Sequence, residues 1–265
     1  MNYSTLDVSL EDQVLCVTLN RPEQANSISL ALAKDLMDLF TKQCENDNVR
    51  AVVITGAGKL FCAGGDLEEM KSQGEDTRAF IRELTSYLHT AISRISVMNA
   101  PVIAAINGTA AGAGLALACA CDLAVASEKS RFLLSYIKAG LVLDGSSSWY
   151  LPRLIGLRRS MELALTNRML SAEEALDWGI INTVLPHDTV LEEAMALARE
   201  LAQGPTGAYG VVKNMFRQSM QVDLERQMEM ESMSMSAAAV SEDGREGMRA
   251  FFEKRPPIFK GKNFS

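Results

Sequence analysis

The sequence has few of the residues on which several kinds of site depend. Its 265 residues include two histidines, His89 and His187, and five cysteines without Cys-x-x-Cys spacing. A zinc site needs clustered Cys and His ligands, a disulfide framework needs an even set of cysteines, and a serine/histidine triad needs a histidine base. None of these three sites is expected. His89 falls in a predicted helix, where we expect it at the surface or at an interface.

Positive charge and aromatic residues are also scarce. The chain has 26 Lys and Arg against 33 Asp and Glu, a net charge of −7, and 6% aromatic residues. This composition predicts no nucleic-acid partner, because such binding needs a positive field. Phosphate loops are missing too, since Gly56-x-Gly58 lacks a third glycine and Lys59 is followed by Leu60. Nucleotide hydrolysis and dinucleotide chemistry are therefore not expected.

Long hydrophobic runs are rare. Residues 1–10 contain no basic segment followed by an apolar one, so no signal peptide is predicted. The one extended apolar stretch, residues 100–121, is rich in Ala and Gly and contains Asn107 and Thr109. This favours a buried strand and a buried helix over a membrane span. We therefore expect a cytoplasmic protein without a membrane partner.

Hydrophobic residues make up 48% of the chain, enough for a sizeable core. Alternating apolar residues predict a hairpin over residues 4–9 and 13–19. Further strands are predicted at residues 51–55, 101–106, 122–126, 131–134 and 181–185. Helical spacing occurs around residues 32–40, 76–98, 112–120, 171–178 and 188–254. Repeated strand and helix units followed by a helical tail predict an α/β fold.

Two glycine-rich turns follow predicted strands. They read Phe61-Cys62-Ala63-Gly64-Gly65-Asp66-Leu67 and Asn107-Gly108-Thr109-Ala110-Ala111-Gly112-Ala113-Gly114. Glycine permits tight turns and close approach of a ligand, so together the turns could hold one carbonyl oxygen on two N–H groups. Such a pair stabilises the charge that develops when a thioester loses an α-proton. The pattern also fits two tight connections that bind nothing.

Only three carboxylates occur between residues 100 and 150, namely Asp122, Glu128 and Asp144. Asp122 begins a buried strand, which indicates a structural hydrogen bond, and Glu128 lies in a polar turn. Asp144 follows three apolar residues, and partial desolvation there would raise its pKa and make it a proton shuttle. The position also suits an N-cap for a helix that begins near residue 145.

Several segments, in order, resemble the crotonase (enoyl-CoA hydratase/isomerase) superfamily. Besides the two turns they are Leu19-Asn20-Arg21-Pro22, Cys121-Asp122-Leu123-Ala124, Leu151-Pro152-Arg153, Ser171-Ala172-Glu173-Glu174-Ala175, Trp178-Gly179 and residues 246–255. The resemblance covers nearly the whole chain. It implies a crotonase-like spiral of ββα units over residues 1–200 with an acyl-CoA site. It also implies a C-terminal helical region over residues 201–265 that joins subunits and covers CoA, in a homotrimer or a dimer of trimers.

The resemblance implies site residues as well. Gly65 and Ala113 would supply the oxyanion N–H groups, although the family usually has glycine where Ala113 stands. The contact comes from the backbone, so alanine can serve. The residues implied to contact substrate are Ala63, Gly64, Asp66, Leu67, Gln24, Ala25, Asn26, Tyr136, Phe251 and Lys254. The positive charge around Lys254 fits a solvated tail equally well.

The implied reaction is an isomerisation. Crotonase-like hydratases use two glutamates, whose positions fall here at Ala116 and Tyr136. Asp144 is placed like the catalytic acid of Δ3,Δ2-enoyl-CoA isomerases and of the phenylacetate-pathway ring-epoxide (1,2-epoxyphenylacetyl-CoA) isomerase. The resemblance thus implies that Asp144 acts as acid and base in converting 3-enoyl-CoA to 2-enoyl-CoA or in rearranging a ring epoxide. No metal and no separate cofactor are expected, because coenzyme A is part of the substrate.

Three alternatives stay open. An enoyl-CoA hydratase (lyase) would need a carboxylate from elsewhere, such as Glu68 or Glu69. A 4-chlorobenzoyl-CoA dehalogenase of the superfamily also has an aspartate at this place, but it holds its aryl ring with aromatic residues, and only Tyr136 and Trp149 are nearby here. A non-catalytic acyl-CoA-binding scaffold would fit the loss of both glutamates but not the presence of Asp144.

Overall fold

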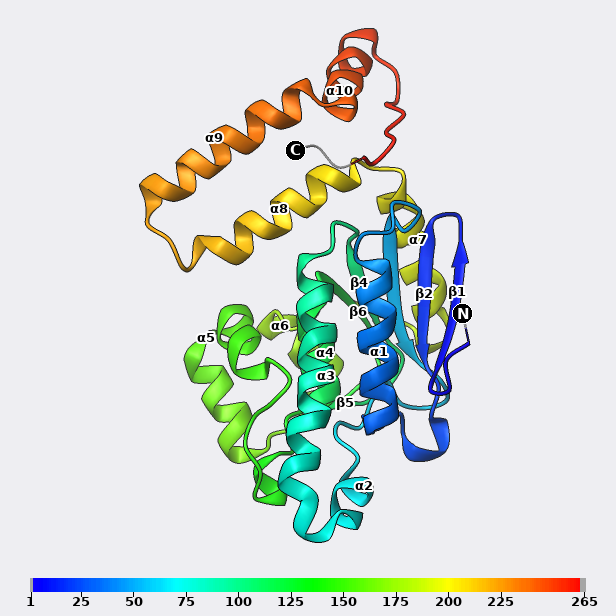
Figure 1. Cartoon of the computed structure of the whole chain (residues 1–265), viewed down its shortest axis with the longest axis vertical. Helices are drawn as coiled ribbons and strands as arrows, with labels where there is room; N and C mark the ends of the chain where they lie inside the picture. Colours follow the sequence, from blue (N-terminus) through cyan, green and yellow to red (C-terminus); the bar gives the residue numbers. More distant parts are fainter. Residues whose placement is uncertain (1, 263–265) are drawn as a thin grey trace.

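A six-stranded sheet forms the centre of the molecule (Figure 1). The structure, a computed structural model, describes residues 2–262. The strands run in the order β1 (Leu6–Glu11), β2 (Val14–Leu19), β3 (Ala51–Gly56), β4 (Val102–Ile106), β6 (Leu123–Ser127) and β8 (Thr183–Leu185). The β1–β2 hairpin is antiparallel and the other pairs are parallel. Strand order thus follows chain order.

Helices cover both faces of this sheet. All residues of β3 and β4 are buried. One face packs against α1 (Leu30–Gln43) and α3 (Thr77–Val97), and the other packs against α7 (Val190–Ala202). Continuous apolar strands require such double cover, because a parallel sheet is buried on both sides. The predicted α/β class is confirmed.

The site-bearing segments follow β3 and β4. After β3 the chain turns into α2 (Leu67–Ser72), and after β4 it forms β5 (Ala110–Ala111) and α4 (Ala113–Ala120). The remaining elements are η1 (Pro22–Gln24), η2 (Gly74–Asp76), β7 (Phe132–Leu133), η3 (Ile137–Ala139), α5 (Ser147–Thr166), α6 (Ala172–Trp178) and η4 (His187–Thr189). β5 pairs with β7 in a small second sheet. This arrangement brings the two glycine-rich turns to one side of the core.

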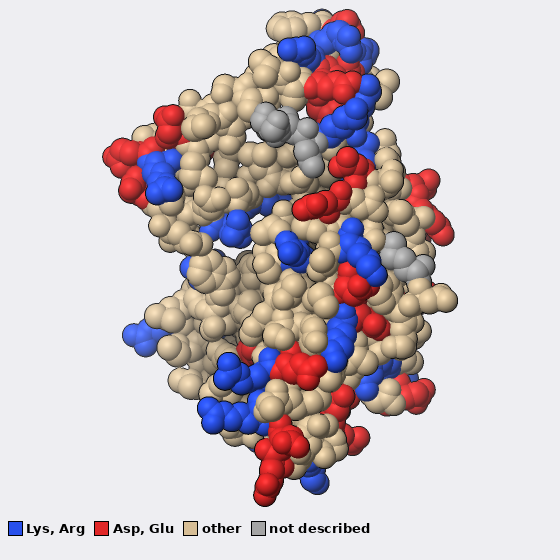
Figure 2. Space-filling model, viewed as in Figure 1, with Lys and Arg blue, Asp and Glu red and all other residues tan. Residues whose placement is uncertain are grey.

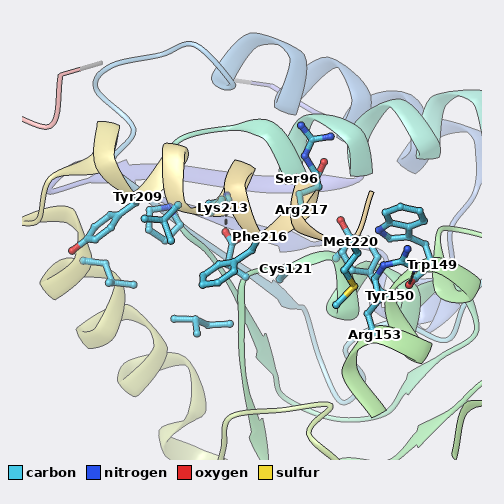
Figure 3. A pocket seen from close by; sticks show the side chains of 16 residues that line it. Ser96, Cys121, Trp149, Tyr150, Arg153, Tyr209, Lys213, Phe216, Arg217 and Met220 are labelled. Atoms are coloured by element: carbon cyan, nitrogen blue, oxygen red, sulfur yellow. Dashed lines mark hydrogen bonds and ion pairs between the residues drawn. The ribbon is translucent and has the colours of Figure 1, made fainter. Parts of the chain in front are cut away.

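The last three helices extend away from the sheet (Figure 1). They are α8 (Thr206–Ser219), α9 (Leu224–Val240) and α10 (Glu242–Glu253), and α9 has no buried residue. Lys213 of α8 reaches the core and pairs with Asp122 at 2.6 Å (Figure 3). Arg50 donates to the carbonyl oxygens of Gly204 and Phe259. Asp122 therefore has the structural role predicted for it.

The surface carries charges of both signs. On the face shown in Figure 2, acidic and basic side chains are interspersed, without one continuous basic area. In the part of the chain that the structure describes, no helix has the length and apolar character to cross a membrane. The division at residue 200 stays a prediction. α7 ends at Ala202 against the sheet, and the extended helices begin at Thr206.

Candidate active site

A cavity of about 450 Å³ opens where α2, α3, the β5–α4 turn and the segment before α5 meet. Its walls are mostly apolar and include Met70, Leu84 and Leu88. Among the described lining residues, Asp144 is the only carboxylate. Residues 2–262 contain no group of three or more His, Cys, Asp or Glu that could hold a metal ion. The cavity thus combines an apolar chamber with one acid.

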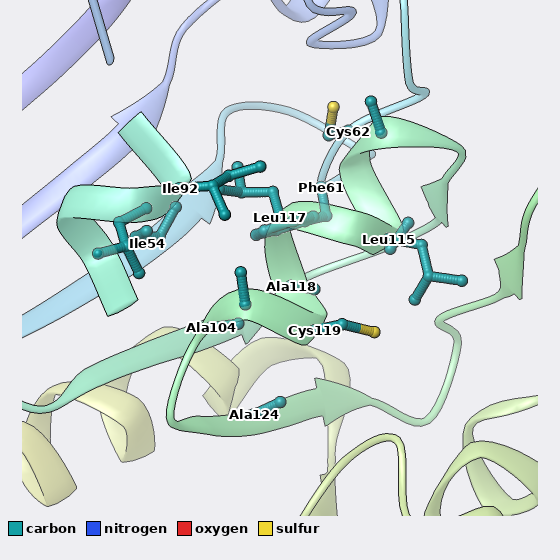
Figure 4. Packing of buried hydrophobic residues seen from close by; sticks show 14 of the residues in the cluster. Ile54, Phe61, Cys62, Ile92, Ala104, Leu115, Leu117, Ala118, Cys119 and Ala124 are labelled. Carbon is teal, nitrogen blue, oxygen red and sulfur yellow. The ribbon is translucent and has the colours of Figure 1, made fainter. Parts of the chain in front are cut away.

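The two glycine-rich turns pack directly against each other. The Cys62 N–H donates to the Thr109 carbonyl at 3.2 Å, and the Ala111 N–H donates to the Cys62 carbonyl at 2.9 Å. Gly114 permits this approach, because a Cβ on it would lie 2.4 Å from the Cys62 carbonyl oxygen. Cys62 is buried in the apolar cluster around α4 (Figure 4), and burial raises the pKa of its thiol to about 12. The thiol therefore fills space rather than reacts.

The N–H groups of Gly65 and Ala113 are the candidate oxyanion donors. Both residues line the cavity. Ala113 begins α4, so its N–H has no intrahelical acceptor, and within residues 2–262 neither N–H donates to a protein group. Gly64 has a φ of +100°, which favours glycine. The Ala63 N–H differs, because it donates to the Ala25 carbonyl at 3.0 Å. The turns thus leave two N–H groups available to a ligand oxygen.

Asp144 supplies the acid of the cavity. Its side chain is 32% exposed, and its Oδ1 lies 2.8 Å from Nε2 of His89. Its carbonyl oxygen accepts from the hydroxyls of Tyr136 and Ser147. Burial raises the pKa of this carboxyl, but hydrogen bonds from His89 and the Gly145 N–H, with the charge of His89, outweigh burial and lower the pKa. The predicted increase in the pKa of Asp144 is therefore wrong.

The N-cap interpretation of Asp144 is also wrong. The residue before α5 is Ser146, which has a φ of +70° and makes no capping side-chain bond. The Asp144 carboxylate is directed instead at His89. It is therefore part of the cavity and not of the helix end.

His89 is a site residue that the sequence does not reveal. It lies on α3 next to Leu88, which lines the cavity, and its ring is half-exposed. The hydrogen bond to Asp144 raises the pKa of His89, although burial lowers it. Because the two partners are 55 positions apart in the sequence, only the packing of α3 beside the segment before α5 brings them together.

Comparison with known proteins identifies the family. The family described as enoyl-CoA hydratase/isomerase matches residues 9–262. The chain belongs to the enoyl-CoA hydratase/isomerase family. The 1,2-epoxyphenylacetyl-CoA isomerase of Escherichia coli (strain K12) is 36% identical over 254 residues, which cover 96% of this chain and 97% of that protein.

Two further proteins that are similar to this chain have different names. The 4-chlorobenzoyl coenzyme A dehalogenase-2 of Arthrobacter sp is 36% identical over 234 residues, or 88% of this chain and 85% of that protein. The crystal structure of an enoyl-CoA hydratase from Bacillus anthracis superposes with a TM-score of 0.92 at 36% identity, covering 98% and 100% of the two chains. The predicted superfamily and crotonase-like fold are confirmed. The chain is an enzyme of a family that acts on acyl-CoA, and the three names leave its reaction open.

In this family member, neither expected hydratase position holds an acid. Ala116 is fully buried on α4, and its Cβ lies 3.1 Å from where a Cβ on Gly145 would be. Tyr136 lines the cavity and donates to the Asp144 carbonyl at 3.3 Å. Burial raises the pKa of the Tyr136 hydroxyl, so it acts here as a hydrogen-bond donor and not as a base.

Four of the predicted substrate-contacting residues line the cavity, namely Ala63, Gly64, Leu67 and Tyr136. Asp66 does not line it. Its carboxylate accepts from Arg21, from Ser27 and from the N–H of Glu69 at the start of α2. Asp66 therefore holds the turn in place, and its direct contact with substrate stays a prediction.

Gln24, Ala25 and Asn26 form the turn after the hairpin. Ala25 touches the first glycine-rich turn through its carbonyl, as described above. Asn26 is fully buried, and its side-chain amide donates to the carbonyl oxygens of Ala57 and Leu60. Gln24 is exposed at the end of η1. Contact of these three residues with CoA stays a prediction. The Asn26 amide is already engaged in hydrogen bonds within the protein.

Phe251 lies on α10 and Lys254 follows it, and α10 is at the opposite end of the molecule from α2 (Figure 1). Neither residue is among those that line the cavity. Phe251 is 79% exposed and packs edge-on against Phe252, with 5.8 Å between ring centroids. Lys254 ends α10 with a φ of +54°. Within one chain the structure does not bring these residues to the cavity. Their contact with the CoA of a neighbouring chain stays a prediction.

Proposed function

We propose that this enzyme is an acyl-CoA isomerase that converts a 3-enoyl-CoA to a 2-enoyl-CoA. The observation that carries the proposal is that Asp144 is the single carboxylate among the described lining residues, in the cavity that also holds Gly65 and Ala113. A 1,3-proton shift needs one group that takes a proton and returns it. Hydration needs a water molecule that is both positioned and deprotonated, and these two tasks require more than one group.

In the first step, the Asp144 carboxylate takes a proton from C2 of the thioester. The electron pair left at C2 moves toward the carbonyl, and the Gly65 and Ala113 N–H groups bind the resulting enolate oxygen. In the second step, the Asp144 carboxyl returns the proton to C4, the double bond moves to C2–C3, and the carboxylate is restored. One oxyanion donor of this kind stabilises the transition state by about 3 kcal/mol.

The charge and shape of the cavity support this sequence of steps. The hydrogen bond from His89 helps to keep the pKa of Asp144 below its usual value, so the carboxyl is ionised at neutral pH and ready to accept the proton. The apolar walls suit a hydrocarbon chain, because burying such a chain removes apolar surface from water.

A ring epoxide is the second candidate substrate. The observation that favours it is the 36% identity to a protein named 1,2-epoxyphenylacetyl-CoA isomerase. The same acid and the same oxyanion donors would assist rearrangement of such a ring. An aryl epoxide thioester therefore belongs in the same assay.

The hydratase alternative lacks a second acid. Glu68 and Glu69 are absent from the described residues that line the cavity. Glu69 accepts from the N–H of Leu30 at 3.0 Å, which fixes its carboxylate at the start of α1. Neither glutamate is therefore placed to activate a water molecule beside Asp144.

Replacing Asp144 tests the proposal. Asp144→Ala and Asp144→Asn should lower kcat for a 3-enoyl-CoA by at least about 100-fold, within the range for a lost acid–base group. KM should change less than threefold, because neither variant alters the apolar walls. Glu68→Gln is the matched control and should keep wild-type kcat. Formation of the conjugated 2-enoyl thioester is followed by absorbance, and wild-type kcat in Asp144→Asn would refute the mechanism.

We also propose that the enzyme forms a homotrimer or a dimer of trimers, needs no resident cofactor and works in the cytoplasm. The exposed apolar side chains on α8 and α9 support the assembly, since Phe216 is 75% and Met235 is 71% exposed. Light scattering on the purified protein should give the mass of three or six chains. A monomer would contradict this part of the proposal.

A further inference from the structure

His89 stands between the active-site cavity and a second cavity. Thr85 and Leu88, its neighbours on α3, line the first cavity, as does Asp144. His89 itself lines the second cavity, of about 430 Å³, together with Tyr150 and Arg217. The Nε2–Oδ1 contact of 2.8 Å therefore joins the acid of one cavity to a histidine that reaches the other. In the mechanism proposed above, Asp144 is the group that exchanges a proton with the substrate, and His89 enters only through its effect on the pKa of that carboxyl.

The titratable and charged groups beside His89 are its partner Asp144 and, among the described residues that line the second cavity with it, Tyr150 and Arg217. Asp144 lies in the segment before α5, Tyr150 lies on α5, and Arg217 lies on α8. The Arg217 guanidinium donates to the side chain of Asn214 at 2.7 Å, which engages it on its own helix. Of the three, only Asp144 is recorded in hydrogen-bond contact with the imidazole in the described part of the chain. Asp144 is therefore the charged group that fixes His89.

We propose that His89 is a positioning residue for Asp144, which holds Oδ1 through Nε2–H and so leaves Oδ2 to exchange the proton with the substrate. The inference rests on the proposed function and deepens it. Without this hydrogen bond, the carboxylate would rotate about its Cβ–Cγ bond. Holding one carboxylate oxygen stops the rotation and so fixes the direction of the second oxygen. The same contact places a positive charge beside the carboxylate whenever the imidazole is protonated.

The hydrogen bond from His89 and the positive charge of its protonated imidazole together predict a defined pH dependence of kcat/KM. In the wild type, hydrogen bonding to His89 lowers the pKa of Asp144, so its carboxylate stays ionised, and able to act as a base, down to a lower pH. Without His89, burial of the carboxyl is less opposed, and the pKa of Asp144 rises. The acid limb of kcat/KM then moves to higher pH. In the wild type the His89 imidazole also titrates, with a pKa above its ordinary value, and this adds an inflection to the pH profile. A variant without the imidazole loses this inflection.

The test compares His89→Gln and His89→Ala with wild type, using the 3-enoyl-CoA assay from pH 5 to pH 9. We expect His89→Ala to lower kcat by about 10- to 100-fold with KM within threefold, because misplacing a reacting group has effects of this size. His89→Gln can still donate from its amide, so we expect it to recover part of kcat. Both variants should move the acid limb upward by about one pH unit.

His187→Gln is the matched control, because His187 bonds to Ser127 on another part of the fold. It should keep the wild-type rate and pH profile. Unchanged pH profiles in both His89 variants would overturn the inference, as would a rise in KM with unchanged kcat. Asp144→Asn separates the two ideas. If that variant is inactive while the His89 variants match wild type, the inference about His89 fails and the isomerase proposal stands.

Discussion

Gly114 sets how closely the two turns of the active site approach. A Cβ at this position would lie 2.4 Å from the Cys62 carbonyl oxygen and 2.6 Å from the Cys62 Cβ. Backbone atoms cannot give way as a flexible side chain can. The turns carry the Gly65 and Ala113 N–H groups, so the separation of the turns also fixes these two candidate oxyanion donors.

Gly114→Ala should therefore damage both stability and activity. Overpacking of this kind costs about 1–3 kcal/mol, and we expect the free energy of unfolding in urea to fall by that amount. The control is Gly247→Ala on α10, where a Cβ meets nothing nearer than 3.4 Å. Alanine favours helix, so the control should be as stable as wild type or up to about 1 kcal/mol more stable. A Gly114→Ala protein with wild-type stability would contradict this packing argument.

Asp144 shows how far single residues can be judged from the sequence. Its apolar neighbours are visible, and they indicate partial burial correctly, since the side chain is 32% exposed. The partner that reverses the pKa shift is His89, which lies 55 residues earlier. The two glycine-rich turns are local motifs that the sequence shows directly, and their oxyanion role stays a prediction, whereas the charge state of Asp144 depends on a long-range contact that no local pattern encodes.

Among the elements, α2 depends on its N-cap. The helix has six residues and no buried side chain, so propensity alone does not hold it. Asp66 accepts from the Glu69 N–H at 3.1 Å and pairs with Arg21 at 3.0 Å. Leu67 and Met70 of the same helix line the cavity. The cap therefore positions part of the substrate chamber.

Removing this cap should have a pH-dependent effect. Burial raises the pKa of Asp66, but hydrogen bonds from the Glu69 N–H, Arg21 and Ser27 lower it overall. A lowered pKa stabilises the folded state above the unfolded value near 3.8, and this contribution is lost as the pH falls through the folded pKa. Asp66→Ala should cost about 1–2 kcal/mol at pH 7.

The matched variant is Asp66→Asn, which keeps a capping group without the charge. Its deficit in unfolding free energy relative to wild type should shrink between pH 7 and pH 3, as the wild-type carboxyl becomes protonated. Urea unfolding at the two pH values measures this. A deficit that is equal at both values would show that the ionised form of Asp66 contributes nothing.

The elements themselves follow the hydrophobic patterns closely. The predicted strand at residues 51–55 is β3, and the predicted helix at residues 171–178 is α6, where Ser171 and Glu174 exchange the hydrogen bonds of a capping box. Helix α2 escapes prediction because it is too short to show a period. Strand β5 escapes because its two alanines have low strand propensity. Both depend on contacts made only in the folded chain.

Across the whole molecule, the C-terminal helices are a part whose apolar side chains a single chain leaves exposed. The α8–α10 region projects from the core and keeps large apolar side chains in solvent, including Phe216 and Phe251. The sequence predicts these helices but not their direction. Helical spacing identifies an apolar helix face but does not indicate which other part of the protein covers that face. In the proposed assembly, the placement of Phe251 relative to a CoA molecule depends on the neighbouring chain.

In the whole enzyme, the cavity combines one carboxylate among its described lining residues, two backbone N–H groups and apolar walls, and under the proposed mechanism this combination should isomerise rather than hydrate. The deciding measurement is the ratio of two rates with purified wild-type protein, isomerisation of a 3-enoyl-CoA and hydration of the corresponding 2-enoyl-CoA. We predict that isomerisation is at least about 100-fold faster, since a missing acid–base group costs that much in the second reaction. Hydration as fast as isomerisation would mean that another group activates water and that the single-acid mechanism is wrong.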